Sequence, residues 1–118
     1  MAERVLGELK VVVDEAARPI EMKFFGESDS ANVSKELRDL FGSYEELAAE
    51  RGLLLDFREL DYMNSSSFPP IVELIRDLHA RQAPVTVLYS QSKPWQRTPF
   101  TAISSIASVY DNLTVKAC

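Results

Sequence analysis

Three consecutive hydroxyl groups, Ser65, Ser66 and Ser67, are the side chains of this sequence best placed for regulatory chemistry. They follow Asn64 in the stretch DYMNSSSFPP, between an apolar segment, LLLDF, and a segment with helical periodicity, IVELIRDL. The first pattern predicts a buried strand and the second a helix, so the serines lie at a strand-to-helix turn. One serine is enough to cap a helix by accepting a hydrogen bond from a free backbone N–H. Three in a row exceed what capping needs.

Reversible phosphorylation is the chemistry that exposed hydroxyls at such a turn could undergo. A phosphate there would lie at the positive end of the helix dipole, which tolerates negative charge. It would also change the local charge by about two units, which a docked partner would sense. From the residues alone, the helix-cap and phosphorylation-site interpretations both remain open.

Other kinds of functional site have little support in the sequence. His79 is the one histidine and Cys118 the one cysteine, so no Cys/His cluster for a metal can form. His79 also lies far along a helix from the serine turn, which disfavours a Ser/His/Asp arrangement. No glycine-rich phosphate-binding pattern occurs. The sequence therefore predicts a protein that is not an enzyme and that has no metal and no cofactor.

Composition narrows the class of protein further. The chain has 118 residues, 46% of them hydrophobic and 26% charged, which is typical of one globular domain spanning residues 1–118. A formal net charge of −5 disfavours nucleic acid and anionic membranes as partners. The first ten residues lack the apolar core of a signal peptide, and a single cysteine permits no intrachain disulfide. We therefore expect a cytoplasmic protein.

Periodicity predicts the elements that position the serine turn. We expect an α/β fold of order ββαβαβαβ, a mixed sheet with packed helices lying in one layer or on both faces. The apolar strand at 53–57 is expected to be covered on both faces. Thr98 and Pro99 are expected to open the last helix. The expected strands are 7–17, 18–28, 53–57, 84–90 and 112–117, and the expected helices are 33–50, 70–82 and 98–110.

The segment LLLDFRELDYMNSSSFPPIVELIRDLHARQAPVTVLYS resembles the centre of a STAS domain, the fold of anti-sigma-factor antagonists and sulfate-transporter tails. Those proteins carry a strand, a segment like Y/F-M-D-S-S/T-G-L, an amphipathic helix and another strand. The predicted element order extends the resemblance over nearly the whole chain. The resemblance implies that Ser65, the first serine after the acidic position, is the phosphoacceptor, with Ser66 as the second candidate.

The chain departs from the family motif at several positions. Asn64 replaces the aspartate and Ser67 the glycine, and this version is similar to the SiaC-type phosphoproteins, which bind a diguanylate cyclase and a switch kinase-phosphatase in biofilm control. The tripeptide GES at 26–28 is also similar to that subgroup. Pro69 and Pro70 remove two amide donors from the helix start, so a phosphate would receive fewer backbone hydrogen bonds.

The resemblance implies partner switching in bacterial signal transduction. Unphosphorylated protein would dock on a partner; a GHKL-type serine kinase would phosphorylate Ser65 and a PP2C-type phosphatase would reverse this. The client would be a sigma-factor regulator or a diguanylate cyclase. Phosphate would act by repulsion and desolvation at the interface. The residues expected to contact the partner are Met63, Asn64, Ser67, Phe68, Trp95 and Arg97. Met63 and Trp95 are equally compatible with burial in the core.

Two further hypotheses remain. Asp14, Glu15, Asp56 and Lys93 are the residue types of a two-component receiver phosphorylated on Asp56, with the acids binding Mg²⁺. The lysine follows the aspartate too closely for a receiver, however, and no helix follows the acidic pair. The other hypothesis is a constitutive STAS-type scaffold or ligand-binding subunit. In that case Trp95 and Arg97 would be contact residues of types enriched at interface hot spots.

Overall fold

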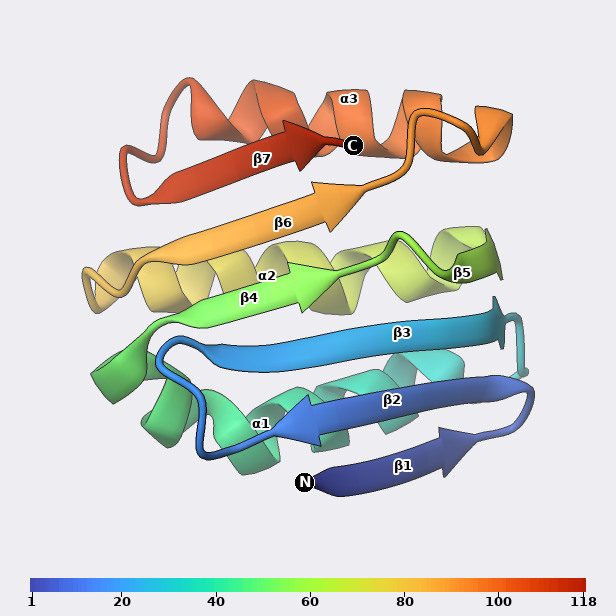
Figure 1. Cartoon of the computed structure of the whole chain (residues 1–118), viewed down its shortest axis with the longest axis horizontal. Coiled ribbons are helices and arrows are strands. Elements are labelled where there is room, and N and C mark those ends of the chain that lie inside the picture. The colour runs from blue at the N-terminus through green and yellow to red at the C-terminus, as the bar shows by residue number, and fades with distance from the viewer.

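The chain forms a seven-stranded sheet and three α-helices, as a computed structural model that describes residues 1–118 shows (Figure 1). The strands are β1 (Ala2–Leu6), β2 (Leu9–Asp14), β3 (Ile20–Ser28), β4 (Leu53–Asp56), β5 (Leu60–Met63), β6 (Val85–Tyr89) and β7 (Leu113–Ala117). The helices are α1 (Val33–Arg51), α2 (Phe68–Ala80) and α3 (Pro94–Ala107), and a short 3₁₀ helix, η1 (Ser65–Ser67), precedes α2. No helix is both long and apolar enough to span a membrane.

Six strands lie side by side in the order β1-β2-β3-β4-β6-β7, and β5 continues the sheet beyond β4 by pairing with β3. The pairs β1–β2 and β2–β3 are antiparallel, whereas β3–β4, β4–β6 and β6–β7 are parallel. Each parallel connection passes through a helix, and all three helices lie behind the sheet in Figure 1. The helices therefore form a single layer on one face.

The core lies between that helix layer and the sheet. Alternate strand residues on the helix side are buried, as the pleat of a strand requires. Three aromatic rings join the centre of the sheet to α3: Phe24 stacks on Phe57 with centroids 4.5 Å apart, and Phe57 lies 5.1 Å from Phe100. Each of these three side chains is at most 2% exposed. These aromatic contacts pack the end of β4 against α3, which respectively precede and follow the serine segment in the chain.

The structure confirms an α/β fold with a mixed sheet and packed helices, and it adds two strands to the predicted order. β1 is an edge strand whose middle residues are all exposed, so its sequence lacks the apolar alternation of a core strand. β5 has only four residues and follows β4 after a three-residue turn. Both strands are recognisable from their pairing in the sheet, which sequence periodicity does not report.

Two local predictions are wrong. The segment 53–57 is covered on one face only, because no helix packs on the other side and Leu54 remains partly exposed there. The last helix begins at Pro94, four residues before Thr98, so Pro99 lies inside its second turn. Pro94 suits a first helical position as well as Pro99 does, because the missing N–H is free there anyway. The helix begins at Pro94 and not at Pro99 because Gln96, in its first turn, is buried against the sheet.

Candidate functional site

The serine turn lies at the edge of the sheet where the parallel strands end. Strands β3, β4 and β6 all finish at this edge, and α1, α2 and α3 all begin there (Figure 1). The positive ends of three helix dipoles are thus gathered on one side of the molecule. β5 ends at Met63, Asn64 forms the bend, and η1 leads directly into α2.

Ser67 is the structural serine of the turn. It is fully buried, and its hydroxyl donates to Asn64 Oδ1 at 2.8 Å or to the carbonyl oxygen of Ser28 at 3.1 Å. Asn64 Oδ1 also accepts a hydrogen bond from the Ser67 backbone N–H at 3.1 Å, so Asn64 is the cap of η1. Asn64 and Ser67, the two residues that depart from the STAS motif, are therefore hydrogen-bonded to each other.

Ser28 fixes this turn to the end of β3. Its hydroxyl lies 2.7 Å from that of Ser67, and its carbonyl accepts the N–H of Asn64 at 2.9 Å. When the Ser67 hydroxyl donates to Asn64, the Ser28 hydroxyl must be the donor to Ser67, because each hydroxyl has one proton. Ser28 is 3% exposed. Its hydrogen bond with Ser67 was not predicted from the sequence, in which the GES tripeptide at 26–28 indicated only a similarity to the SiaC-type proteins.

Ser65 and Ser66 differ from Ser67 in both exposure and bonding. Both residues are exposed, and all side-chain hydrogen bonds of the turn belong to Asn64, Ser67 and Ser28. The first turn of α2 carries no acidic side chain. A phosphate on Ser65 or Ser66 would therefore be attracted by the positive end of the helix dipole and not repelled by an acid in that turn. The hydroxyls of Ser65 and Ser66 therefore make no side-chain hydrogen bond that holds the turn, and they are accessible to another protein.

Aromatic side chains contact one another on the elements that begin or end at this edge of the sheet. Tyr62, on β5, is 46% exposed and lies 6.4 Å from the ring of Trp95, at the start of α3. Trp95 is partly exposed and also packs against Phe100, and its indole nitrogen is buried without a hydrogen-bond partner. Lys93 pairs with Asp61 at 2.8 Å, which ties the start of α3 to β5.

The residues expected to contact a partner are not equally accessible. Asn64 is partly exposed, Arg97 is exposed on α3 and makes no ion pair, and Phe68 is half-buried with its ring 6.4 Å from that of Phe100. Met63 is 8% exposed and belongs to the core, as does Ser67. Met63 and Ser67 therefore shape the turn from below, and the accessible surface consists of Ser65, Ser66 and the aromatic side chains at this edge of the sheet.

Gln96 is a positioning residue that sequence reasoning missed. It is fully buried; its amide donates to the carbonyls of Phe57 and Leu60 at 2.8 and 3.0 Å, and its oxygen accepts the N–H of Ser90 at 2.8 Å. One side chain thus holds together the β4–β5 turn, the end of β6 and α3. The available signal was its spacing, since positions 96, 100 and 103 lie on the same helix face.

The residues of the receiver hypothesis do not come together. Asp14 lies at the level of Leu54 on the second strand from β4, and its carboxylate accepts a hydrogen bond from the Ala16 N–H. Glu15 accepts a hydrogen bond from the Tyr44 hydroxyl of α1. Lys93 bonds Asp61 rather than Asp56. Burial raises the pKa of Asp56, but hydrogen bonds from the Arg58 side chain at 2.8 and 3.0 Å and from its backbone N–H outweigh this and hold that pKa below its ordinary value. Asp56 is therefore an ion-pair partner, and the receiver hypothesis is not supported.

Comparison with known proteins identifies the fold. No protein-family model matches the chain, and no curated protein matches it. Among solved structures, apo-SiaC from Pseudomonas aeruginosa matches with a TM-score of 0.71 at 18% identity, over 99% of this chain and 100% of that one. A chain in the complex of the diguanylate cyclase SiaD with its activator SiaC, from the same organism, matches with a TM-score of 0.63 at 20% identity, over 100% of both chains.

The anti-sigma factor antagonist SpoIIAA in its unphosphorylated form is a further match, with a TM-score of 0.57 at 19% identity, over 84% of this chain and 96% of that one. A phosphorylated form of SpoIIAA has also been solved and is similar to this chain. The chain therefore has the STAS fold, and its similarity to SiaC extends over the full length of both proteins.

Proposed function

We propose that this protein is a non-enzymatic signalling protein of the partner-switching kind, acting in the cytoplasm, with Ser65 as its regulatory phosphorylation site and Ser66 as the second candidate. The unphosphorylated turn docks on a partner, and the phosphate prevents docking. A GHKL-type serine kinase adds the phosphate and a PP2C-type phosphatase removes it. The protein itself supplies the acceptor and the docking surface.

The observation that carries this proposal is that the three serine hydroxyls differ in burial and in hydrogen bonding. Ser67 is buried and makes the hydrogen bonds that hold the turn, whereas Ser65 and Ser66 are exposed and make none. A kinase can therefore reach Ser65 without unfolding the turn. Occurrence of SpoIIAA in unphosphorylated and phosphorylated forms supports phosphorylation of a protein with this fold.

The chemical step needs only the hydroxyl of this chain. The Ser65 oxygen attacks the γ-phosphorus of ATP bound to the kinase, its proton passes to a base of the kinase, and ADP leaves. The product carries about −1.5 to −2 charges at neutral pH. Docking then requires desolvation of a dianion at this edge of the sheet, which is unfavourable for a partner whose contact surface is apolar or acidic.

A diguanylate cyclase is the client best supported by similarity, because SiaC is described as the activator of the cyclase SiaD. The sequence resemblance to anti-sigma-factor antagonists keeps a sigma-factor regulator as the second candidate client. The contact residues proposed on this chain are Phe68, Trp95 and Arg97, with Asn64 at the margin and Met63 and Ser67 supporting the surface from within. The role proposed for the pathway, control of biofilm formation, follows that of the SiaC-type proteins.

Phosphopeptide mapping of protein purified from its native cells is the first test. A phosphate on Ser65 or Ser66 supports the switch, and unmodified protein across growth conditions leaves a constitutive docking subunit instead. The second test compares capture of partners by wild type, Ser65→Ala and Ser65→Asp proteins. We expect Ser65→Ala to retain partners and Ser65→Asp to lose them. Ser43→Asp, which places the same charge on an exposed serine of α1, is the matched control and should retain them.

A further inference from the structure

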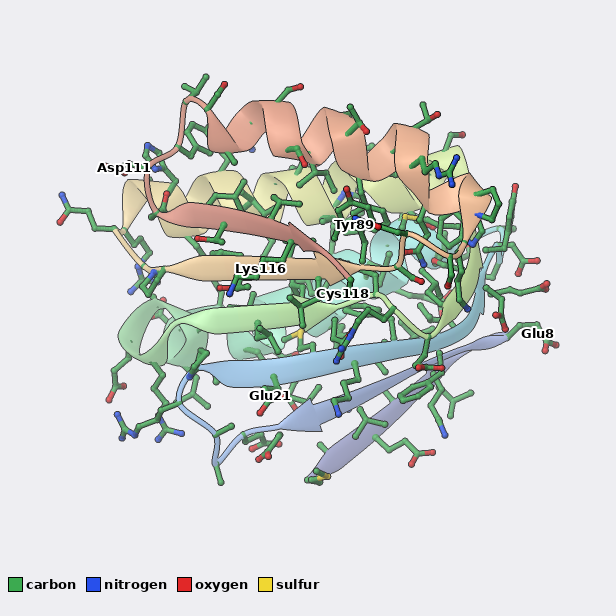
Figure 2. All side chains as sticks on the ribbon, turned by 45° about the horizontal axis from the view of Figure 1, so that its top comes forward. Glu8, Glu21, Tyr89, Asp111, Lys116 and Cys118 are labelled. Carbon is green, nitrogen blue, oxygen red and sulfur yellow. The ribbon has the colours of Figure 1, made fainter.

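A shallow groove runs between α1 and α2 on the outer side of the helix layer. The two helices lie behind the sheet in Figure 1, and Figure 2 shows the sheet, which carries Glu21 and Lys116, in front of them. The buried residues Phe41, Pro70 and Leu74 form an apolar floor, and the groove has a volume of about 180 Å³. Small-molecule pockets have volumes of roughly 300 Å³ or more, so this groove fits a single side chain rather than a whole ligand.

Gly42 opens this groove, although the fold does not require a glycine at that position. Gly42 is exposed and lies in the interior of α1, where glycine is the least favourable residue after proline. A Cβ added to it would meet no atom within 4 Å, and its φ is not positive. Neither close packing nor backbone conformation therefore explains the glycine. A residue that disagrees with its local structure in this way indicates a functional surface.

Two ion pairs join α1 to α2, one on each side of Gly42. The Arg38 guanidinium donates to the Glu73 carboxylate at 3.0 and 2.7 Å. The Arg81 guanidinium donates to the Glu46 carboxylate at 2.9 and 3.1 Å. In both pairs the partners are 35 residues apart in the sequence. The two helices therefore run side by side in the same direction with a constant register.

Asp77 has no such partner across the groove. Gly42 and Asp77 have the same sequence separation as the two ion pairs, and both line the groove. Because residues four apart lie on the same side of a helix, Gly42 and Asp77 face each other midway between the two pairs. The one cation near Asp77 is its neighbour Arg76, at 3.8 Å, which is too long for a hydrogen bond. The row of interhelical ion pairs therefore lacks a cation at this level.

The charges that line the groove favour a cation. They are three acidic side chains and one basic one, Glu45, Glu73, Asp77 and Arg38, with a net charge of −2. Arg76, beside the groove, reduces this to −1, and the ion pair of Arg81 adds no net charge. Glu45 makes no ion pair and no side-chain hydrogen bond, whereas Glu73 is held by Arg38. Asp77 and Glu45 are therefore the carboxylates available to a bound cation.

We propose that this groove binds an arginine side chain of a partner protein. The guanidinium pairs with Asp77 beside Gly42 and completes the row of ion pairs, and the aliphatic stem covers the apolar floor. Arginine suits the site better than lysine because its planar head is weakly hydrated and can bond a carboxylate through two N–H groups. None of the serines of the turn lines the groove, so binding here does not depend on phosphorylation of Ser65.

Chemical-shift mapping on the isotope-labelled full-length protein tests the groove. The probe is an alanine-based helical peptide with arginines on one face, and the matched peptide has glutamine in their place. We expect saturable shifts of the amide signals of Gly42, Leu74 and Asp77 with the arginine peptide and none with the glutamine peptide. Asp77→Asn should raise the dissociation constant about threefold. Gly42→Gln fills the groove and should raise it about tenfold or more.

Control variants keep the test specific. Ser43→Gln makes the same change as Gly42→Gln one residue further along α1, and Glu50→Gln removes an exposed charge of α1; both positions lie outside the groove and both variants should bind like wild type. Thermal unfolding should show that Gly42→Gln melts no lower than wild type, because glutamine is a better helix former than glycine. Ser65→Asp should also bind like wild type.

Three outcomes would overturn the proposal. One is equal binding of the arginine peptide by wild type and Gly42→Gln. Another is equal binding of the two peptides, or shifts spread over acidic residues throughout the surface, because either would show that no arginine site exists in the groove. The third is loss of binding in Ser65→Asp, which would place the peptide at the serine turn instead.

Discussion

Replacement of Ser67 by alanine should destabilise the fold, whereas replacement of Ser65 or Ser66 by alanine should leave the free energy of unfolding almost unchanged. The Ser67 hydroxyl is fully buried and lies within 3.1 Å of three oxygens, from Asn64 and from the side chain and backbone of Ser28. Its removal leaves the buried Ser28 hydroxyl without a partner, which costs about 1–3 kcal/mol. Exposed substitutions without contacts change stability by no more than about 0.5 kcal/mol.

Thermal and urea unfolding at neutral pH measure these differences. For a chain of this length, about 1 kcal/mol corresponds to a fall in melting temperature of roughly 4 °C, so Ser67→Ala should melt about 4–12 °C lower than wild type. A double-mutant cycle sharpens the test. In Ser28→Ala, the Ser67 hydroxyl keeps Asn64 as its partner, and in the double variant no unpaired hydroxyl remains. The double variant should therefore lose less stability than the sum of the single variants.

Two results would refute this reasoning. If Ser67→Ala is as stable as wild type, the buried hydroxyl network does not hold the turn. If Ser65→Ala or Ser66→Ala is as destabilising as Ser67→Ala, the three hydroxyls do not divide into structural and free groups. The second result would also remove the main support for Ser65 as a regulatory site, because a serine needed by the fold is less available to a kinase.

Further predictions concern two glycines, the ion pair between buried Asp56 and the more exposed Arg58, and a buried amide. Gly26→Ala should lower the free energy of unfolding by about 2 kcal/mol or more, because φ at Gly26 is +85° and an added Cβ would lie 2.3 Å from the backbone oxygen of Glu8. Gly42→Ala should raise the free energy of unfolding by about 0.5–1 kcal/mol, because Gly42 lies in α1 with open space around it. Urea denaturation measures both. The lowered pKa of Asp56 means that its pairing with Arg58 stabilises the fold above the ordinary value of 3.8 and is lost as pH falls through the folded-state pKa. Arg58→Gln should therefore cost about 1–3 kcal/mol at neutral pH and much less in acid, as denaturation at both pH values would show. Gln96→Ala removes three buried hydrogen bonds, two to the carbonyls of Phe57 and Leu60 and one from the N–H of Ser90. It should lower the melting temperature by at least about 8 °C in calorimetry.

The burial pattern explains why most elements could be predicted from sequence. Helices α1 and α2 have apolar residues on one stripe, and β2 and β3 alternate buried with exposed residues, so their periods are visible in the sequence. β1 and β5 lack this signature, because one is an exposed edge strand and the other a four-residue extension of the sheet. Their existence depends on a neighbouring strand to pair with.

By itself, the sequence determined that this chain folds as a mixed α/β sheet with a serine-rich turn between a strand and a helix, because periodicity and turn residues are local properties. Only the tertiary structure decided how the three hydroxyls divide. Ser28 is 39 residues from Ser67 along the chain, and it comes within 2.7 Å of it only when β3 and β5 pair. The same holds for Gln96, whose partners lie in the β4–β5 turn and directly after β6. It also holds for the single helix layer, which exists because all three crossover helices lie on one side of the sheet. Long-range contacts of this kind depend on topology, and adjacent residues do not encode them.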